Sequence, residues 1–373
     1  MPYKLLYANS IFETAERISL FCNQSSYDFH QKKYLFDILI DTGKLSCLLL
    51  PEHGLFSEQQ DQENVKSREY RGIPCFSMYD KMMDHTGPNE QSLSGSDLLI
   101  VDINDVGVRY FTYTTHMFAL LDYVSSHYPD LQVVIIDRAN PIGIKVEGTL
   151  IEDRYTSFLG SRGMIHRHGM STGELCDWYI KLNKLGINLT KIKYNHTAQN
   201  LYFISPSPNL PTLNSLFVYP GQCFWEATTL SEGRGTTRPF EIFGHPGFKI
   251  RDTEKICSLF NNKFKKLAFL RPTSFIPVFH KHSGLVCNGW HLFIEDRSNY
   301  HTLIGTLVIM RLVKEYFFDV DFWRQGSYEF DSQGTAAQLL IGDDELINFV
   351  NLNTDEVFIW EKITTSQHLW SMT

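Results

Sequence analysis

Four short apolar runs in this chain each lead into a cluster of acidic, basic and amide side chains, the residue types that acid–base chemistry needs. A short apolar run bounded by turn residues is typical of a buried parallel strand. Ligands of an open parallel sheet bind outside the carboxyl ends of its strands, so we expect these clusters to line one site. The runs and the clusters that follow them are 46–50 with PEHG (51–54), 97–101 with DINDVGVR (102–109), 133–136 with DRANP (137–141), and 202–204 with PSPNLP (206–211).

Glu52 is the leading candidate for a proton donor. It stands between Pro51 and His53, just after an apolar run, so its carboxyl is expected to be half-buried. Desolvation favours the protonated form of a carboxyl, and a general acid must carry its proton near neutral pH. The alternative interpretation is that Glu52 only caps the turn at the end of the strand.

Asp102, Asp105 and Arg109 follow the second apolar run. Asp105 and Arg109 are four residues apart, which suits an ion pair at the start of a helix. In the functional interpretation, one aspartate positions a water or a substrate hydroxyl, and Arg109 binds an anion. Tyr113 adds aromatic surface beside them. The sequence leaves both interpretations open.

The third and fourth clusters offer further candidates for substrate binding. Asp137, Arg138 and Asn140 supply an acid, a base and an amide within four residues, and Asn209 lies in a proline-rich turn. Asn140 precedes a proline, a common turn pattern, and Arg138 can serve only to neutralise neighbouring carboxylates. A structural role is therefore the alternative for each of them.

A glycine-rich segment adds Glu232, Arg234 and Thr236 to the candidate site. Gly233 and Gly235 flank Arg234, and glycines permit close approach of the backbone to a ligand. The alternative is a tight surface turn without a ligand.

Several common motifs are missing from the sequence. No G-x-G-x-x-G follows the first apolar run, and there is no P-loop and no G-x-S-x-G elbow. Dinucleotide-binding, nucleotide-binding and serine-hydrolase functions therefore lose their main support. The H-x-H pairs at 166–168 and 280–282 have no third ligand at a diagnostic spacing. We predict no metal and no cofactor.

The composition favours an ordinary soluble globular protein. The 373 residues are 43% hydrophobic and 20% charged, and the formal net charge of −8 argues against nucleic-acid binding. The seven cysteines are dispersed without a C-x-x-C pair, as expected for free thiols. Neither a signal peptide nor a membrane-spanning stretch is visible, so the predicted location is cytoplasmic, or periplasmic if a leader was trimmed before Met1.

Alternating strand and helix patterns predict an α/β fold, a Rossmann-like and mainly parallel sheet with helices on both faces. A smaller C-terminal α+β domain is expected to follow it, which gives predicted domains of 1–247 and 248–373. The segment 205–247 is predicted as a long functional loop. The expected elements are a strand at 18–22, helices near 31–43, 111–127, 172–186, 252–264 and 301–317, and strands near 274–280 and 290–295.

Nine motifs, taken in order, resemble those of the bacterial exo-β-N-acetylmuramidase family, long catalogued as a domain of unknown function. The resemblance covers nearly the whole chain, and nine motifs in order are far more specific than any one of them. The motifs are PEHG (51–54), D-x-x-DVGVRYFTY (102–113), DRxNP (137–141), SFxG (157–160), RHGMSTGEL (167–175), PSPNLPT (206–212), YPG (219–221), SEGRGTTRPFE (231–241) and FD-x-x-G (330–334).

The resemblance implies a glycosidase of cell-wall recycling that hydrolyses non-reducing-terminal N-acetylmuramic acid from peptidoglycan fragments. The catalytic glutamate proposed for the family maps onto Glu52, which the local chemistry also favours. Glycoside hydrolysis generally uses two carboxyls, and the substrate's lactyl carboxylate needs a cation. The candidates for the second carboxyl are, in order, Asp105, Asp102 and Glu232, and those for the cation are Arg109 and Arg234.

Two other classes of protein are kept as alternatives. One is a muropeptide- or carbohydrate-binding protein that has a cleft between its two domains, as the resemblance implies, but no catalytic activity. The other is an esterase or amidase that acts on cell-wall fragments. The expected partner in each case is a saccharide derived from peptidoglycan. The sequence predicts no oligomeric state.

Overall fold

The computed structural model describes residues 3–60, 63–80, 85–194, 203–317, 321–329 and 334–373. The chain divides into two units, and each is described by itself. The first unit comprises Met1–Gly107, Phe111–Ile144 and Gly169–Pro208. The second comprises Val108–Tyr110, Lys145–His168 and Asn209–Thr373.

Within the described part of the first unit lies a seven-stranded sheet of order β13-β10-β9-β1-β4-β6-β5. Its neighbouring strands are parallel except for β5, which is antiparallel to β6 at one edge. Numbered along the chain and taken from the β6 side, the parallel strands follow the 3-2-1-4-5-6 order of Rossmann folds, which confirms the predicted sheet. The strands are β1 (Ile18–Cys22), β4 (Leu45–Leu50), β5 (Arg68–Tyr70), β6 (Ile73–Ser77), β9 (Leu98–Asp102), β10 (Gln132–Asp137) and β13 (Asn188–Lys193).

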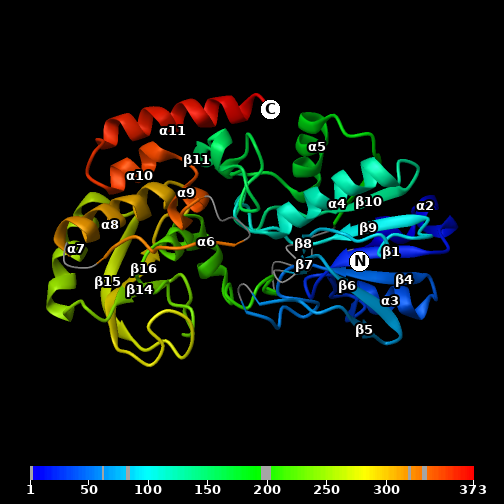
Figure 1. The fold of residues 1–373 in the computed structure, drawn as a ribbon, viewed down its shortest axis with the longest axis horizontal. Coiled ribbons are helices and arrows are strands. Elements are labelled where there is room, and N and C mark those ends of the chain that lie inside the picture. Colours follow the sequence, from blue (N-terminus) through cyan, green and yellow to red (C-terminus); the bar gives the residue numbers. More distant parts are fainter. Residues whose placement is uncertain (1–2, 61–62, 81–84, 195–202, 318–320, 330–333) are drawn as a thin grey trace. The chain divides into compact units, whose positions relative to one another are not determined.

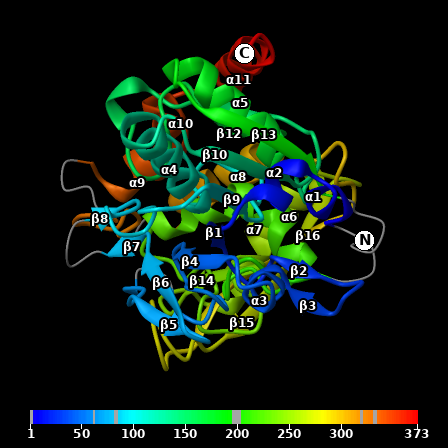
Figure 2. The same cartoon turned by 90° about the vertical axis from the view of Figure 1, so that its right-hand side faces the viewer.

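Alternation along the strands gives this sheet two buried faces. On one face, Leu20, Leu48 and Ile100 of three adjacent strands join a core with side chains of the helices α1, α2 and α3. Side chains one position along point to the opposite face, which α4 and α5 cover (Figures 1 and 2). The helices are α1 (Lys4–Tyr7), α2 (Ser10–Thr14), α3 (Leu35–Asp41), α4 (Tyr113–His127) and α5 (Thr172–Asn183), and two small hairpins pair β2 (Tyr27–Asp28) with β3 (Lys33–Tyr34) and β7 (Tyr79–Asp80) with β8 (His85–Thr86).

The strand predicted at 202–204 is wrong where it can be examined. Residues 203–204 form no strand, and Tyr202 lies outside the described residues. The parallel strand at this edge of the sheet is β13, which pairs with β10. Its alternating polar sequence gives no continuous apolar run because it is an edge strand, with Ile192 as its buried residue.

The second unit contains a three-stranded antiparallel sheet of order β14-β16-β15 within the described residues, together with helices, as predicted for an α+β domain. The sheet strands are β14 (Ile242–His245), β15 (Ala268–Phe275) and β16 (Cys287–Ile294), and β11 (Glu147–Leu150) pairs with β12 (Ile165–Arg167). The helices are η1 (Asp153–Tyr155), α6 (Leu213–Gln222), η3 (Cys223–Ala227), α7 (Ile250–Lys263), α8 (Thr302–Tyr316), α9 (Ala336–Ile341), α10 (Asp344–Val350) and α11 (Glu356–Ser371).

The segment 205–247 differs from its prediction. It contains α6, η3 and β14 rather than one long loop. The structure groups Asn209–Gly247 with the second unit, where β14 pairs with β16. The predicted domain boundary stays a prediction.

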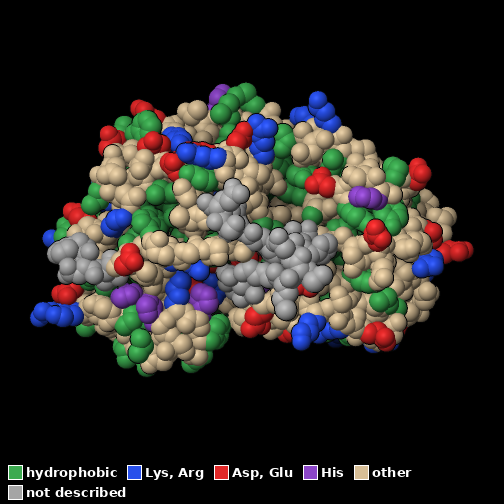
Figure 3. Space-filling view, viewed as in Figure 1, with side chains coloured by type: hydrophobic (Ala, Val, Ile, Leu, Met, Phe, Trp, Pro, Cys, Tyr) green, Lys and Arg blue, Asp and Glu red, His purple; other side chains and the backbone are tan. Residues whose placement is uncertain are grey.

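Three properties of the chain bear on its surroundings. None of the helices in the described part of the chain is long and apolar enough to cross a membrane. The seven cysteines are buried free thiols. The cytoplasmic location stays a prediction. On the face drawn in Figure 3, acidic and basic side chains are interspersed.

Candidate active site

The turn after β4 presents Glu52 on an unusual backbone. His53 and Gly54 both adopt left-handed conformations, with φ of 72° and 83°. The φ of Gly54 lies in the region that glycine adopts without strain, which favours glycine at this position. A residue such as His53 rarely adopts a positive φ, and backbone strain of this kind gathers at functional sites. Glu52 itself is buried, with 3% of its surface exposed.

The first turn of α4 contacts both leading carboxyl candidates. The Thr112 hydroxyl donates a hydrogen bond to Glu52 Oε2 at 2.6 Å, and the Thr114 hydroxyl donates one to Asp105 Oδ1 at 2.9 Å. The main-chain N–H of Glu52 donates to Nε2 of His116 at 3.4 Å. Two carboxyls that follow different strands, β4 and β9, therefore meet the same end of one helix.

Asp105 is held at both of its carboxyl oxygens. Besides the Thr114 bond at Oδ1, its Oδ2 atom accepts the main-chain N–H of Gly107 at 2.7 Å. Asn140 packs against Gly107 so closely that a Cβ atom there would lie 2.6 Å from Asn140 Oδ1. These bonds fix the position of the Asp105 carboxyl at the start of α4.

The 206–207 segment is fastened against the turn that carries Glu52. His53 donates from Nδ1 to the main-chain oxygen of Gln59 at 3.0 Å, which leaves Nε2 to accept from the Ser207 hydroxyl at 3.2 Å. Burial raises the pKa of Tyr113, so its phenol remains a donor. The donors to the main-chain oxygen of Pro206 are the side chains of Asn23, Ser57 and Tyr113.

Asp102 and Arg138 form a buried ion pair at the carboxyl ends of β9 and β10. Arg138 Nε lies 2.6 Å from Asp102 Oδ1, and the Tyr3 hydroxyl donates to Asp102 Oδ2 at 2.6 Å. Although burial lowers the pKa of Arg138, Asp102 raises it above its usual value. The guanidinium also stacks on the Tyr194 ring at 4.0 Å. These contacts are those expected of residues that stabilise the fold. The pair lies near the point where the strand order reverses, at which Rossmann folds bind nucleotides.

Asp137 and Asn140 stabilise local chain turns. Asp137 Oδ1 accepts the main-chain N–H of Gly173 in the first turn of α5 at 2.9 Å. Asn140 Oδ1 accepts the N–H of Ile142, and its amide donates to the main-chain oxygen of Met170. Both residues therefore make the contacts expected of the structural role that the sequence left open as an alternative.

Arg109 belongs to the second unit and is fully buried. Its guanidinium donates to the main-chain oxygens of Leu159, Leu339 and Leu340, the last two at the C-terminal end of α9. Burial lowers its pKa to about 10. A Cβ atom at Gly342 would lie 2.4 Å from the guanidinium, so the cation packs closely against the chain at this glycine. Its contacts are those of a structural cation.

Glu232 and Arg234 are buried members of an ion-pair cluster, which we call the 232 cluster. It is defined by Glu226, Glu232, Arg234, His280 and Lys281. Lys281 Nζ lies 3.0 Å from Glu232 Oε2, and Arg234 Nη1 lies 3.0 Å from Glu226 Oε1. Although burial raises the pKa of Glu232, Lys281 and His280 outweigh it and hold this pKa well below its usual value. The contacts with cations show how these residues stabilise the fold, and their predicted contact with substrate stays a prediction.

The glycines around Arg234 face protein backbone. A Cβ atom at Gly233 would lie 2.5 Å from the main-chain oxygen of Ile242, and one at Gly235 would lie 2.5 Å from that of Phe279. The Thr236 hydroxyl donates to the main-chain oxygen of Gly233 at 2.6 Å. Tight packing of the chain on itself therefore explains this motif. Asn209 is buried at the start of the long second-unit segment.

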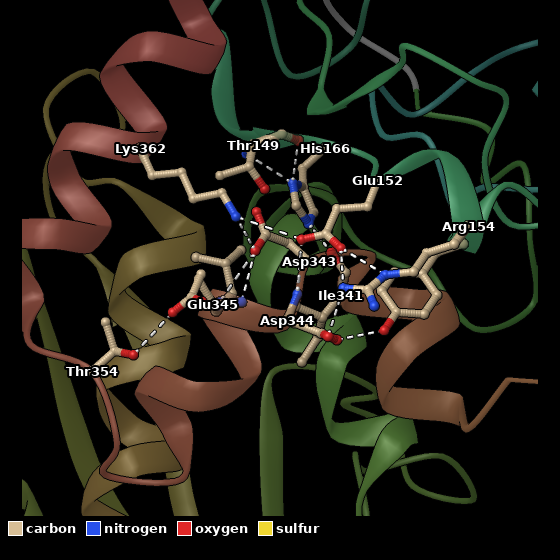
Figure 4. A network of polar contacts seen from close by, with 12 residues as sticks. Thr149, Glu152, Arg154, His166, Ile341, Asp343, Asp344, Glu345, Thr354 and Lys362 are labelled. Atoms are coloured by element: carbon tan, nitrogen blue, oxygen red, sulfur yellow. Dashed lines mark hydrogen bonds and ion pairs between the residues drawn. The ribbon is translucent and has the colours of Figure 1, made fainter.

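A polar network that the sequence did not predict surrounds Asp343 (Figure 4). Lys362 Nζ lies 2.6 Å from Asp343 Oδ1, which also caps α10 by accepting the N–H of Glu345. Burial lowers the pKa of His166 well below its usual value, and its Nε2 donates to the main-chain oxygen of Ile341 at 2.7 Å. Among the described residues, no group of three or more His, Cys, Asp or Glu side chains could hold a metal ion.

Sequence reasoning missed Thr112, Thr114 and His116. These residues form the run T-x-T-x-H, directly after the aromatic residues that were singled out. On a strand, alternate residues would point to the same face, but here the run leads into the helix α4. The hydroxyl bonds to Glu52 and Asp105 are therefore visible only in the structure. Hydroxyls at a helix start next to candidate acids were the available signal.

The fold defines an α/β protein of Rossmann-like topology, in which the turns after β4 and β9 bring Glu52 and Asp105 to the start of one helix. Two family models match the chain, "Exo-beta-N-acetylmuramidase NamZ, N-terminal" over residues 18–214 and "Exo-beta-N-acetylmuramidase NamZ, C-terminal" over residues 217–371. The chain therefore belongs to the exo-β-N-acetylmuramidase NamZ family, which confirms the resemblance seen in the motifs.

Individual relatives agree with this assignment. The chain is 33% identical over 327 residues to peptidoglycan beta-N-acetylmuramidase NamZ of Bacillus subtilis (strain 168), a match that covers 84% of this chain and 77% of the relative. Two crystal structures of DUF1343 family proteins from Bacteroides fragilis NCTC 9343 share the fold. The 1.65 Å structure has a TM-score of 0.82 and 22% sequence identity, and the match covers 100% of this chain and 96% of the other. The 1.30 Å structure has a TM-score of 0.70 and 24% sequence identity, and the match covers 99% of this chain and 95% of the other.

Proposed function

We propose that this protein is a glycosidase that removes terminal N-acetylmuramic acid from peptidoglycan fragments, with Glu52 as its general acid. Family membership and the B. subtilis relative support the reaction. The observation that carries the role of Glu52 is its burial at a strained turn, with Oε2 bonded by the Thr112 hydroxyl. A buried carboxyl bonded by a neutral hydroxyl can hold a proton near neutral pH.

In this mechanism Glu52 protonates the glycosidic oxygen as the bond to the anomeric carbon breaks. Positive charge then develops on the sugar ring, and a second carboxyl must stabilise it or activate the attacking group. Of the three candidates, Asp105 fits best because it contacts the same helix end as Glu52. Asp102 and Glu232 instead form ion pairs with Arg138 and Lys281.

The test compares two substrates in Glu52→Gln. A muramyl disaccharide needs a proton on its leaving sugar oxygen, whereas a 4-nitrophenyl muraminide releases a stable anion without one. We expect kcat on the disaccharide to fall by about 10²- to 10⁴-fold, the usual contribution of general acid catalysis, and to fall far less on the aryl substrate.

The matched control is Glu69→Gln, which removes an exposed carboxylate of β5 in the same unit. It should keep wild-type rates on both substrates. Near-normal turnover of the disaccharide by Glu52→Gln refutes the assignment. Saturable binding of the disaccharide by the wild-type protein without any product favours the non-catalytic alternative.

One observation favours a second candidate function, the esterase. Ser207, His53 and the Gln59 carbonyl form a nucleophile, a base and a group that orients the base, at 3.2 and 3.0 Å. If the protein is an esterase, Ser207→Ala abolishes hydrolysis of an acyl ester of muramic acid. In the glycosidase, the same variant keeps release of muramic acid from the disaccharide.

A further inference from the structure

The main-chain oxygen of Pro206 accepts hydrogen bonds from three side chains. The Tyr113 hydroxyl donates at 2.5 Å, the Ser57 hydroxyl at 2.9 Å and the Asn23 amide at 3.2 Å. Pro206 is buried, so these donors stand where water would bind an exposed carbonyl. A carbonyl oxygen has two lone pairs, and three donors are therefore one more than it needs.

The three donors come from different elements of the first unit. Ser57 lies in the turn after β4 that also carries Glu52, Tyr113 is the first residue of α4, and Asn23 follows β1. The acceptor lies in the stiff sequence Pro-Ser-Pro at 206–208, where each proline fixes φ and lacks an N–H. One oxygen on a rigid segment therefore connects two turns and the start of a helix.

The turn that carries Glu52 is held together by main-chain hydrogen bonds. The N–H of Gly54 donates to the oxygen of Pro51 at 3.1 Å, and the N–H of Ser57 donates to the oxygen of Gly54 at 3.3 Å. Ser57 is therefore linked through two successive bonds to the residue that precedes Glu52. A shift of Ser57 moves the backbone on which the Glu52 carboxyl is mounted.

The contacts form a closed cycle that includes Glu52. Its Oε2 atom accepts from the Thr112 hydroxyl at 2.6 Å, and Thr112 directly precedes Tyr113 in the chain. The Tyr113 and Ser57 hydroxyls meet at the Pro206 oxygen, and Ser57 returns the cycle to the turn of Glu52. The acid is thus held both at its carboxyl and through its backbone.

We propose that Tyr113 and Ser57 are positioning residues, which hold Glu52 in place through the acceptor oxygen that they share. The inference rests on the proposed function and deepens it. Tyr113 is fully buried and its hydroxyl bonds the chain, so this role needs no contact with the substrate. Placing the acid before the substrate binds contributes to rate, because a displacement of about 1 Å can cost about 100-fold.

The shared acceptor determines how the two residues combine. When one hydroxyl is lost, the Pro206 oxygen keeps two donors, enough for its two lone pairs. When both are lost, only the Asn23 amide at 3.2 Å remains, and the cycle is open between α4 and the turn of Glu52. Residues that act through one partner have non-additive effects, so we expect the double variant to lose more than the two single variants together.

The experiment measures turnover of the muramyl disaccharide by Tyr113→Phe, Ser57→Ala and the variant with both changes. We expect each single variant to lose at most about threefold in kcat and the double variant about 100-fold, where independent effects would give at most about ninefold. KM should stay within about twofold of wild type, since neither residue contacts the substrate. On the 4-nitrophenyl muraminide, whose leaving group needs no proton, the double variant should lose at most about threefold.

The matched controls are Tyr179→Phe and Ser46→Ala, alone and combined. The Tyr179 hydroxyl donates to Asp122 of α4 at 2.7 Å, and the Ser46 hydroxyl donates to the main-chain oxygen of Ile18 at 2.9 Å. They remove the same two chemical groups from the same unit but share no acceptor. The combined control should keep wild-type turnover on both substrates, and urea unfolding of each variant establishes that the rates refer to folded protein.

A second pair of changes keeps the test open if the double variant does not fold. Tyr113→Phe with Asn23→Ala leaves Ser57 as the donor to the Pro206 oxygen. It is compared with each of its single variants, so that the separate bonds of Asn23 with Ser25 cancel. A loss beyond the product of the two single losses is again expected.

Three outcomes separate this inference from the proposed function. A double variant that loses only the product of the single losses, or as much on the aryl substrate as on the disaccharide, overturns the positioning role. A full loss in Tyr113→Phe or Ser57→Ala alone also overturns it, because the shared oxygen is then not what matters. In both cases a Glu52→Gln variant that is inactive on the disaccharide leaves the glycosidase standing, whereas near-normal turnover by Glu52→Gln refutes the proposed function itself.

Discussion

Buried carboxyls in two regions of this protein are held by different kinds of donor. In the first unit, Glu52 and Asp105 accept hydrogen bonds from threonine hydroxyls of α4. In the second, Glu232 of the 232 cluster forms ion pairs with Arg234 and Lys281. Those hydroxyls are neutral donors, whereas Arg234 and Lys281 are cations, one buried and one half-buried.

This difference bears on the acid–base role proposed for Glu52. The pKa of Glu232 lies well below its usual value, since Lys281 and His280 outweigh the effect of burial. A carboxylate so bound stays charged across the working range of pH. A neutral hydroxyl, in contrast, donates to either form of a carboxyl, which is what an acid–base residue requires.

The sharpest way to break the comparison is to remove the main cation of the 232 cluster. Lys281→Met leaves Glu232 buried beside fewer positive charges, and removing one partner of a buried ion pair costs about 3–5 kcal/mol. We expect the free energy of unfolding in urea to fall by that amount, with turnover per folded molecule unchanged. If the free energy of unfolding falls by less than about 1 kcal/mol, Glu232 depends on its cation no more than a carboxyl depends on a neutral hydroxyl.

Glu241 is intermediate between the two kinds of carboxyl, and its pH dependence sharpens the comparison. Burial raises its pKa, but His291 at 3.6 Å and hydrogen bonds from Thr212 and Asn214 outweigh this and lower it to about 2. A folded-state pKa below the unfolded value means that ionised Glu241 stabilises the fold above about pH 5, and that this is lost as the pH falls toward 2.

Glu241→Gln should therefore cost about 2–3 kcal/mol at pH 7, and progressively less below pH 5. Urea unfolding of the variant and the wild type at pH 7, 5 and 3.5 measures the difference. A difference that stays constant over this range would mean that the charge of Glu241 is not what its donors recognise.

Much of the fold follows from the sequence because buried parallel strands are continuous apolar runs. β1, β4, β9 and β10 were predicted in this way. The edge strand β13 was missed because one of its faces is exposed, which removes the apolar run. The structure in 205–247 was missed because Pro220 lies inside α6, where a proline pattern suggests a loop.

For the site, the sequence located the acids but not their environments. Asp102 and Asp105 are three residues apart in one turn, yet one is bound to Arg138 and the other to Thr114. Those partners come from other parts of the chain or from a helix start whose bonds the sequence does not show. The fate of a charged side chain depends on such long-range partners, so local spacing leaves the alternatives open.

A smaller effect tests the comparison within the first unit. Tyr3→Phe removes the hydroxyl that donates to Asp102 and accepts from Arg138, so a buried pair loses one neutral bridge and keeps both charges. We expect a loss of about 1–2 kcal/mol in the free energy of unfolding, as for one buried hydrogen bond to a charged group. A loss as large as that of Lys281→Met would show that neutral donors count as much as cations.

The smallest expected effect comes from an ion pair outside the core. Arg162 Nη2 lies 2.6 Å from Asp153 Oδ2, as close as any contact of the buried pairs, but the two side chains are 75% and 64% exposed. Water and salt screen such a pair, and holding two long side chains together costs entropy. Arg162→Ala should therefore leave the urea midpoint unchanged. A loss comparable to that of Tyr3→Phe would mean that short distance, rather than burial, makes the pairs of this protein strong, and the distinction between its two kinds of carboxyl would then lose its physical basis.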